Sequence, residues 1–185
     1  MGDMNKVLVL DLETTDLRPQ LGEIIEIGAV LLSADGTIEK VIDTVVKPTK
    51  PTKLWRDCWC LRNTSLTVKA VLAGQSLSGM RCSLQKLLRE YPVTSYNRDF
   101  DIKYLTYNGF KVYQKVACPM VLAADILKLP GYRGDYKWPK FQEAWDYFFP
   151  CESYGILHRA LDDAWHVARL IHRLEELGYY ALGSE

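Results

Sequence analysis

The sequence has no apolar run long enough to cross a membrane, although 48% of its 185 residues are hydrophobic. A membrane-spanning helix needs roughly 20 consecutive apolar residues. The N-terminal stretch MGDMNKVLVLDLE turns acidic too soon for a secretory signal. We therefore expect a soluble, cytoplasmic protein with no membrane partner. The length suits one domain over residues 1–185, with a core of about 5–178.

Cysteines and glycine-rich signatures are also too few to define a site. The five cysteines are scattered and odd in number, which does not suggest a disulfide framework. Cys58 and Cys60 have no second pair, which disfavours a zinc site. Neither G-x-G-x-x-G nor G-x-x-x-x-G-K-[ST] occurs, which disfavours a Rossmann or P-loop nucleotide-binding protein.

The chain has no net charge, because 23 basic residues balance 23 acidic ones. Acidic residues are in excess over 1–50 and 151–185, and basic residues over 51–150. A strongly basic patch that would bind a long duplex through phosphates alone is not evident. The middle of the chain could still present a positive surface around an acidic centre.

The apolar pattern predicts an α/β domain with a mixed sheet. Three strands are expected over Lys6–Leu10, Glu23–Leu32 and Thr37–Val46, and the Asp-Gly turn joins the last two as an antiparallel hairpin. A short strand is expected at Pro92–Ser95, and a strand or a helix at Val116–Ala123. The expected helices cover Leu66–Leu72, Ser78–Tyr91, Arg98–Tyr107, Pro139–Phe148 and His158–Leu177.

The first strand ends in two carboxylates, in the stretch VLVLDLETTDL. Residues two apart share a face of a strand, so Asp11 and Glu13 continue the side lined by Val7 and Val9. Buried carboxylates are costly unless they are compensated. Divalent cations with oxygen ligands, Mg²⁺ or Mn²⁺, would compensate them. The alternative is that both acids simply lie at the exposed end of the strand.

The last helix divides its own acids between two faces. Asp163 recurs with Val167, Leu170 and Leu174, so it points at the sheet, where it either joins the carboxylates or is a buried acid satisfied by backbone donors. Its neighbour Asp162 belongs to a polar stripe that we expect to be a solvated face with ion pairs. This stripe comprises Asp162, His166, Arg169, Arg173 and Glu176.

Two further segments can deliver polar groups to the same cleft. In NRDFDIKYL, Asp101 shares a mostly apolar side with Leu105, and Asn97 stands where an N-cap would begin the helix. His158 precedes Asp163 by five residues, so both reach one cleft only if His158 lies just before the helix. Histidine titrates near neutral pH, but a lone histidine is equally well structural.

Three motifs resemble those of the DnaQ-like (DEDDh) 3′–5′ exonuclease superfamily, which includes the proofreading epsilon subunit of bacterial DNA polymerase III, ribonuclease T and oligoribonuclease. The motifs are DLETT (Asp11–Thr15), NRDFD (Asn97–Asp101) and HRALDDA (His158–Ala164), in the family's order and spacing. The resemblance implies a ribonuclease H-like α/β fold. Its mixed sheet has five strands, an antiparallel second strand and helices on both faces.

The resemblance also implies the chemistry of the site. Asp11, Glu13 and Asp163 would bind one metal ion, and Asp11 would bridge to a second that Asp101 supports. His158 would be the general base for the attacking water. The expected cofactors are two Mg²⁺ or Mn²⁺ ions, and the expected reaction releases nucleoside 5′-monophosphates from single-stranded 3′ ends, with DNA slightly favoured over RNA.

For substrate binding, the resemblance points to residues beside the carboxylates, although Leu17 could equally be a core residue. Two residues depart from the family's usual pattern. Asp16 stands where many members have glycine, and Tyr96 stands where a histidine often precedes the asparagine of the second motif. Basic and aromatic residues at Lys47, Lys50, Lys53 and in the loop Tyr132–Lys140 suit stacking on single strands. The alternative is a solvated loop with a few anchoring aromatic residues. The role of Trp55–Cys60 is open. The residues that would bind substrate are Thr14, Thr15, Leu17, Asn97 and Phe100.

Two other functional classes compete with this interpretation. One is a non-catalytic nucleic-acid-binding or polymerase-associated module with the same fold. The other is an endonuclease of the wider ribonuclease H-like group, which a circular single-stranded substrate would distinguish. The sequence leaves open a DNA polymerase partner and the oligomeric state.

Overall fold

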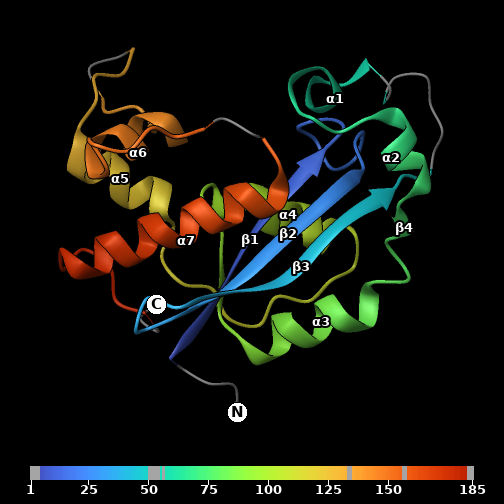
Figure 1. Ribbon diagram of the computed structural model, residues 1–185, viewed down its shortest axis with the longest axis horizontal. Helices are drawn as coiled ribbons and strands as arrows, with labels where there is room; N and C mark the ends of the chain where they lie inside the picture. Colours follow the sequence, from blue (N-terminus) through green and yellow to red (C-terminus); the bar gives the residue numbers. More distant parts are fainter. Residues whose placement is uncertain (1–4, 50–54, 56, 133–134, 156–157, 183–185) are drawn as a thin grey trace.

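A computed structural model of the protein describes residues 5–49, 55, 57–132, 135–155 and 158–182. Its strands are β1 (Lys6–Thr14), β2 (Ile24–Ser33), β3 (Ile38–Lys47), β4 (Gln75–Ser76) and β5 (Val93–Thr94). Its helices are α1 (Trp59–Asn63), α2 (Val68–Ala73), α3 (Arg81–Glu90), α4 (Arg98–Tyr107), α5 (Pro119–Leu127), α6 (Phe141–Phe148) and α7 (Ala160–Glu176). Figure 1 shows their arrangement.

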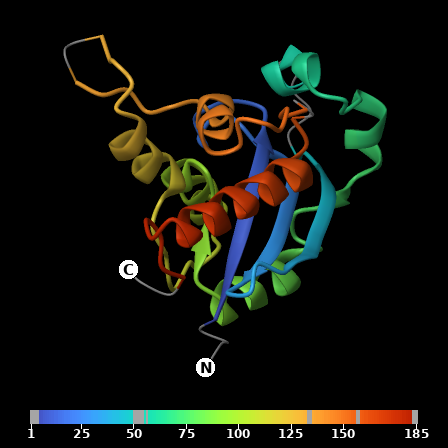
Figure 2. The same ribbon diagram turned by 60° about the vertical axis from the view of Figure 1, so that its left-hand side comes forward.

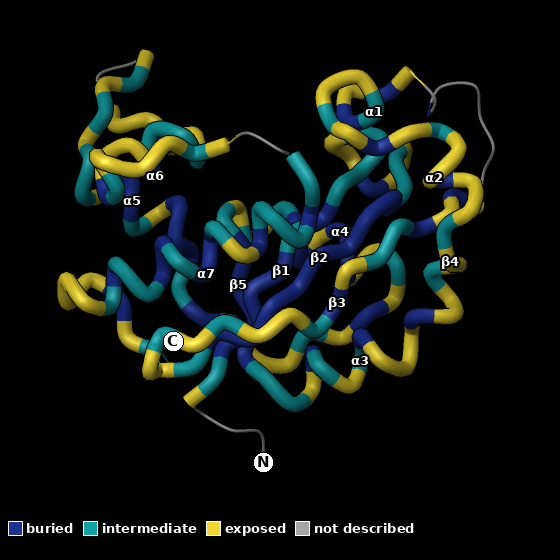
Figure 3. The backbone as a smooth tube through the Cα atoms, in the orientation of Figure 1, coloured by how far each residue is buried: buried dark blue, intermediate teal, exposed yellow. Residues whose placement is uncertain are grey.

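The strands form one mixed five-stranded sheet in the order β4-β3-β2-β1-β5. Strand β2 is antiparallel to both β1 and β3, and its pairing with β3 is the hairpin that the Asp-Gly turn predicts. The two short outer strands are each parallel to their partner, β5 to β1 and β4 to β3. The longest strands therefore lie together in the middle, and Figure 3 shows β1 and β2 as largely buried, whereas β3 is mostly intermediate or exposed.

Helices cover both faces of the sheet, and the alternation along β1 decides which residues meet which helices. Leu8, Leu10 and Leu12 pack with the apolar residues of α3 and α4. Val7 and Val9 pack on the opposite face with α7. Figure 2 shows α7 lying across one face of the sheet while α3 lies behind it. Because Asp11 and Glu13 continue the Val7–Val9 side, they face α7.

Several element boundaries differ from the sequence-based expectation. The ambiguous segment Val116–Ala123 leads into helix α5, which has a proline in its first turn, where a missing N–H costs nothing. Helix α2 begins later than predicted because the Thr67 side chain caps it, accepting a hydrogen bond from the N–H of Ala70. Helix α7 begins at Ala160, so His158 lies just before it. None of the described helices is long and apolar enough to span a bilayer.

The segment around Trp55–Cys60, whose role the sequence leaves open, builds a small core of its own, as far as its residues are described. Trp55, Cys58 and Cys60 are buried together with residues of α2 and with Ile25 of β2. Arg56 lies outside the described residues, as do Lys50 and Lys53. Trp59, between the two cysteines, is exposed. The segment therefore holds α1 over the end of β1 and β2 and presents an exposed indole.

The polar stripe of α7 agrees with the expected solvated face only in its last turn, where Arg173 and Glu176 form an exposed ion pair at 3.0 Å. Arg169 lies over the rings of Trp145, Phe149 and Trp165, at 5.1, 5.0 and 5.3 Å from their centroids. It also pairs with Glu152 at 2.9 Å. Aromatic residues of α6 and of the following segment therefore cover the stripe at Arg169, which periodicity within α7 cannot reveal.

Candidate active site

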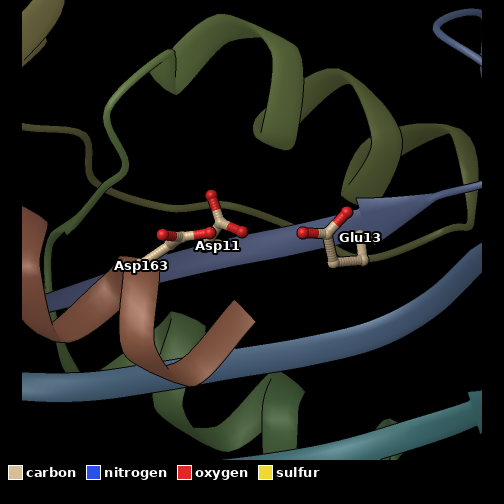
Figure 4. Close-up of side chains that lie close together, drawn as sticks. All are labelled: Asp11, Glu13 and Asp163. Atoms are coloured by element: carbon tan, nitrogen blue, oxygen red, sulfur yellow. The ribbon is translucent and has the colours of Figure 1, made fainter. Parts of the chain in front are cut away.

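Three carboxylates meet where β1 passes beneath the first turn of α7. One oxygen from each of Asp11, Glu13 and Asp163 lies within 4.8 Å of the other two. The carboxylates of Asp11 and Asp163 are adjacent, and that of Glu13 points toward them (Figure 4). All three are partly buried, so the alternative of two acids at an exposed strand end does not describe them. The structure thus brings together three acids that the sequence directs toward one cleft.

The electrostatics of the group favour a bound cation. Burial raises the pKa of Asp11 well above its ordinary value, and repulsion by Asp101, Asp163 and Glu13 raises it further. Burial likewise raises the pKa of Glu13 to about 8, although the Cys60 thiol opposes the rise. The pKa of Asp163 is also raised by burial. The ionised forms of these neighbouring carboxylates repel one another, and a nearby positive charge stabilises them.

Asp101 lies near these three carboxylates, but its oxygens are not among those that lie within 4.8 Å of one another. Its side chain is 3% exposed, and Ser95 Oγ donates to Asp101 Oδ2 at 2.6 Å. Among the described residues, its other oxygen, Oδ1, is buried without a hydrogen-bond partner of normal geometry. Burial raises the pKa of Asp101 to about 7, against the effect of the Ser95 hydrogen bond. An orphaned carboxylate oxygen beside an acidic cluster fits a second cation ligand.

A glycine in β2, opposite Asp11, lets α7 approach the sheet closely. Asp11 pairs across the sheet with Gly28 of β2. A Cβ atom at Gly28 would lie 2.1 Å from the backbone carbon of Ala160, at the start of α7. The close crossing of helix and sheet therefore requires glycine here, and it brings Asp163 to Asp11.

An ion pair fixes the same end of α7. Glu26 is 1% exposed, and its Oε1 accepts hydrogen bonds from Arg159 Nε at 2.8 Å and Nη2 at 2.6 Å. Its other oxygen accepts the N–H of Ala160 at 3.2 Å. The carboxylate thus satisfies a free N–H at the helix N-terminus, where negative charge is favoured. Sequence reasoning missed Glu26, because it reads as one polar residue within the apolar strand EIIEIGAVLL.

His158 immediately precedes Arg159 of this ion pair and has an unusual backbone conformation. Its φ is +39°, a left-handed value that is uncommon outside glycine and that clusters at functional sites. It lines a cavity of about 610 Å³ together with Asp11 and Asp163. The Trp59 ring meets the His158 ring edge-on, with 5.3 Å between the centroids. His158 and Asp163 therefore reach one cleft, as a position just before the helix requires.

The hydrogen-bonding partners of three of these carboxylates are all neutral. Ser95 donates to Asp101, the Tyr154 hydroxyl donates to Asp163, and the Cys60 thiol interacts with Glu13. Neutral donors hold a carboxylate in place without cancelling its charge. The charge is thereby left for a cation, and a set of hard oxygen ligands suits Mg²⁺ or Mn²⁺. The residues present fit such ions.

Trp59 lines both of two cavities at the site. The first, of about 610 Å³, includes Tyr96, Lys140 and Tyr154 beside the acids. The second, of about 510 Å³, lies over the end of β1 and includes Thr14, Leu17 and Phe100. Each has a size typical of small-ligand sites. Trp59 and Tyr154 were not among the sequence-predicted site residues, because neither belongs to a periodic pattern or to a motif.

The expected substrate residues have different surroundings. Thr14, Thr15, Leu17 and Phe100 all line the second cavity, and Leu17 is 81% exposed, which excludes the core alternative. The Thr15 hydroxyl is already occupied, because it accepts the N–H of Glu23 at 2.9 Å. Asn97 is exposed and occupies the N-cap position of α4, as expected, but its side chain makes no capping hydrogen bond.

Asp16, the departure from glycine, supports its turn with its side chain. The carboxylate accepts hydrogen bonds from the N–H of Arg18 at 2.9 Å and from Arg18 Nε at 3.1 Å. The Tyr104 hydroxyl donates to the backbone oxygen of Asp16. The turn is therefore held by aspartate through hydrogen bonds and needs no left-handed backbone at this position.

Comparisons with known proteins agree with this geometry. A family model described as an exonuclease, RNase_T, matches residues 8–171. An uncharacterized exonuclease of Escherichia phage 186 is 29% identical over 183 residues, which span 92% of this chain and 89% of the phage protein. A PolC-type DNA polymerase III of Thermotoga petrophila is also 29% identical, over 179 residues. That match spans 92% of this chain and only 12% of the polymerase.

Solved structures share the fold at lower identity. A full-length 3′-exonuclease superposes with a TM-score of 0.73 at 20% identity, over 95% of this chain and 62% of that one. Escherichia coli Exonuclease I in complex with a dA16 oligonucleotide gives 0.67 at 15% identity, over 93% and 41%. At such identities these matches establish the fold alone, and they confirm the predicted ribonuclease H-like sheet.

Proposed function

Because the chain belongs to the RNase_T exonuclease family, we propose that it is a metal-dependent exonuclease that hydrolyses single-stranded nucleic acid from the 3′ end. The family match confirms the resemblance inferred from the three motifs. The direction of digestion, the release of nucleoside 5′-monophosphates and a slight preference for DNA over RNA are parts of this proposal.

The observation that carries the proposal is the convergence of Asp11, Glu13 and Asp163 within 4.8 Å beside His158 and Asp101. Two bound Mg²⁺ or Mn²⁺ ions would neutralise these carboxylates, activate a water molecule and stabilise the leaving 3′ oxygen. Asp11, Glu13 and Asp163 would hold one ion, and Asp11 and Asp101 the other. Without such ions, the buried negative charges would oppose the approach of a phosphodiester.

His158 then acts as the general base. Its imidazole accepts a proton from the water that attacks phosphorus, while the bond from phosphorus to the 3′ oxygen breaks and that oxygen takes up a proton. The anchored Arg159 beside it restricts the backbone of His158. The base is thereby held at the cavity that also contains Asp11 and Asp163.

The substrate strand would extend from the second cavity, past Trp59, into the first. The terminal nucleotide would contact Thr14, Leu17 and Phe100, which line the second cavity. Further out, the loop before α6 exposes Tyr132, Tyr136 and Trp138, which suit stacking on bases. Arg133 in this loop lies outside the described residues.

The similarity to PolC-type polymerases motivates a further part of the proposal. Because the chain covers only 12% of those polymerases, association with a DNA polymerase is proposed as one setting for the activity. Autonomous digestion of single-stranded ends is the other setting.

The test is digestion of matched 5′-labelled single-stranded DNA and RNA with Mg²⁺ or Mn²⁺. We expect a ladder that shortens from the 3′ end and is abolished by EDTA. His158→Ala should lower the rate by at least about 100-fold, the lower range for loss of an acid–base group. Asp101→Asn should also lower it strongly, because the second ion would lose a charged ligand. Asp99→Asn is the matched control, because Asp99 lies on the same helix but pairs with Arg98 at the surface.

The control variant should retain wild-type activity. Absence of cleavage by folded wild-type protein with either metal would overturn the proposal in favour of a binding module. Cleavage of a circular single strand would instead indicate an endonuclease.

A further inference from the structure

Tyr154 lies in the segment between α6 and α7 and contacts the acidic cluster at Asp163. Its hydroxyl donates a hydrogen bond to Asp163 Oδ1. The residue also lines the cavity shared by Asp11, His158 and Asp163. None of the three exonuclease motifs contains it, so the family match gives it no role.

The ring of Tyr154 is held on three sides. Phe141 and His166 meet it edge-on, with centroids 5.1 and 5.0 Å away, and Trp145 lies tilted against it at 5.7 Å. Phe141 and Trp145 belong to α6, and His166 belongs to α7. Packing from two helices thus fixes the direction in which the hydroxyl points.

The backbone that carries Tyr154 is also tied down. Trp145 Nε1 donates to the backbone oxygen of Glu152 at 3.1 Å. The Glu152 carboxylate pairs with Arg169 of α7 at 2.9 Å, and the Arg169 guanidinium lies over Trp145. The covered polar stripe of α7 therefore has a consequence for the site, because it holds the segment that supplies the hydroxyl.

The hydrogen bond uses one oxygen of Asp163 and leaves the other available. Within the described part of the chain, Asp163 Oδ2 accepts no hydrogen bond, and the Asp163 carboxylate lies next to that of Asp11 (Figure 4). A lysine or arginine in this place would cancel the charge of Asp163, whereas the neutral phenol does not. Partners of this kind orient a metal ligand and raise its affinity for the ion.

We propose that Tyr154 is a positioning residue, whose hydroxyl orients the Asp163 carboxylate so that its second oxygen is presented to a divalent cation. This inference rests on the proposed function only in assigning a metal ion to the site. It concerns ion binding and makes no demand on the nature of the nucleic acid.

The test compares Tyr154→Phe with wild type in Mn²⁺ binding, measured by titration calorimetry without nucleic acid. Phenylalanine keeps the ring packing and removes only the hydroxyl. We expect a dissociation constant about tenfold higher, the lower range for loss of such a partner. The Mg²⁺ concentration for half-maximal cleavage should rise similarly, while the rate at saturating Mg²⁺ stays within about threefold of wild type, because the hydroxyl takes no proton in the reaction.

Tyr180→Phe is the matched control. The Tyr180 hydroxyl is also buried and donates to a backbone oxygen, that of Ala117 at 3.2 Å, within the core on the α7 face. This variant should bind Mn²⁺ like wild type. Thermal unfolding in EDTA should show that both variants are folded.

Each outcome bears on the inference separately from the proposed function. Unchanged or tighter Mn²⁺ binding by Tyr154→Phe overturns it, even if the wild type is a metal-dependent exonuclease. Weakened binding supports it, even if the wild type fails to cleave. Absence of Mn²⁺ binding by the wild type overturns both.

Discussion

At the scale of single residues, the loop after β1 offers two exposed leucines with different surroundings. Leu17 is 81% exposed and lines the cavity beside Glu13, whereas Leu21 is 62% exposed and lies outside that cavity. Exposed apolar side chains cost little stability when they are removed. The difference between the two positions therefore reports on substrate contact alone.

We expect Leu17→Ala to lower kcat/KM on single strands by roughly tenfold, because burying a leucine against a ligand contributes about 1.5–3 kcal/mol. Leu21→Ala, in the same loop, should stay near wild type. Steady-state digestion of a short oligonucleotide measures both, and melting temperatures should be unchanged. Equal effects of the two substitutions would contradict a role for Leu17 in substrate binding.

At single residues, the sequence predicts the site correctly where the periodicity of a strand or helix decides which way a side chain points. The alternation Val7, Val9, Asp11, Glu13 places two carboxylates on one face, and the helical spacing of Asp163 aims it at the same face. Tyr154 and Trp59 could not be found this way, since both lie outside a periodic stretch. Their positions depend on packing between segments distant in the sequence, which a single sequence does not record.

At the scale of elements, the close crossing of α7 over β2 is a second testable feature. A methyl group at Gly28 would overlap the backbone of α7 at 2.1 Å, and backbone cannot move aside as a flexible side chain can. Helix and strand would have to separate, and Asp163 would move away from Asp11. Stability and activity should therefore fall together.

We expect Gly28→Ala to destabilise the fold by about 3 kcal/mol, the upper range for overpacking, and to abolish most of the metal-dependent cleavage. Gly155→Ala is the control for the stability change, because a Cβ there meets nothing within 4 Å. Urea unfolding with and without Mn²⁺ measures both effects. Wild-type stability of Gly28→Ala would show that α7 does not lie as close to β2 as described.

The elements themselves were predicted best where the pattern is long. The three central strands and helices α3, α4 and α7 follow from repeated apolar spacing, with small shifts at their ends. The short helix α1 was missed, because five residues are too few to show a period. The segment at Val116–Ala123 stayed ambiguous, since a short apolar run fits a strand and a helix equally.

At the scale of the whole molecule, the acidic cluster makes folding depend on pH and on metal. The pKa values of Glu13 and Asp101 rise from 4.5 and 3.8 to about 8 and about 7 on folding. Between about pH 4 and pH 8, the folded protein therefore binds more protons than the unfolded chain does. Stability that is present near pH 4 is lost as the pH rises toward 8.

We expect the metal-free protein to have a lower melting temperature at pH 8 than at pH 5.5. In the presence of Mn²⁺, we expect the melting temperature to be higher at pH 8 than at pH 5.5. An ion at about 100 times its dissociation constant adds about 2.7 kcal/mol, or roughly 5–10 °C for a domain of this size. Melting curves in EDTA and in Mn²⁺ across this range measure the effect.

Asp101→Asn should flatten the pH dependence, and Asp99→Asn should not. A metal-free protein whose melting temperature rises toward pH 8 would contradict the direction of these pKa shifts.

The glycine opposite Asp11 has a consequence for the interpretation of related sequences. Only a residue without a side chain at position 28 allows the helix to bring Asp163 to the strand carboxylates. A homologue can keep all four acids and carry a larger residue at this position. Its sequence would then contain every metal ligand, but in its structure Asp163 would lie too far from the strand carboxylates to share an ion with them. Position 28 can therefore serve as a marker, outside the catalytic motifs, that separates competent relatives from those that have kept the motifs and lost the site.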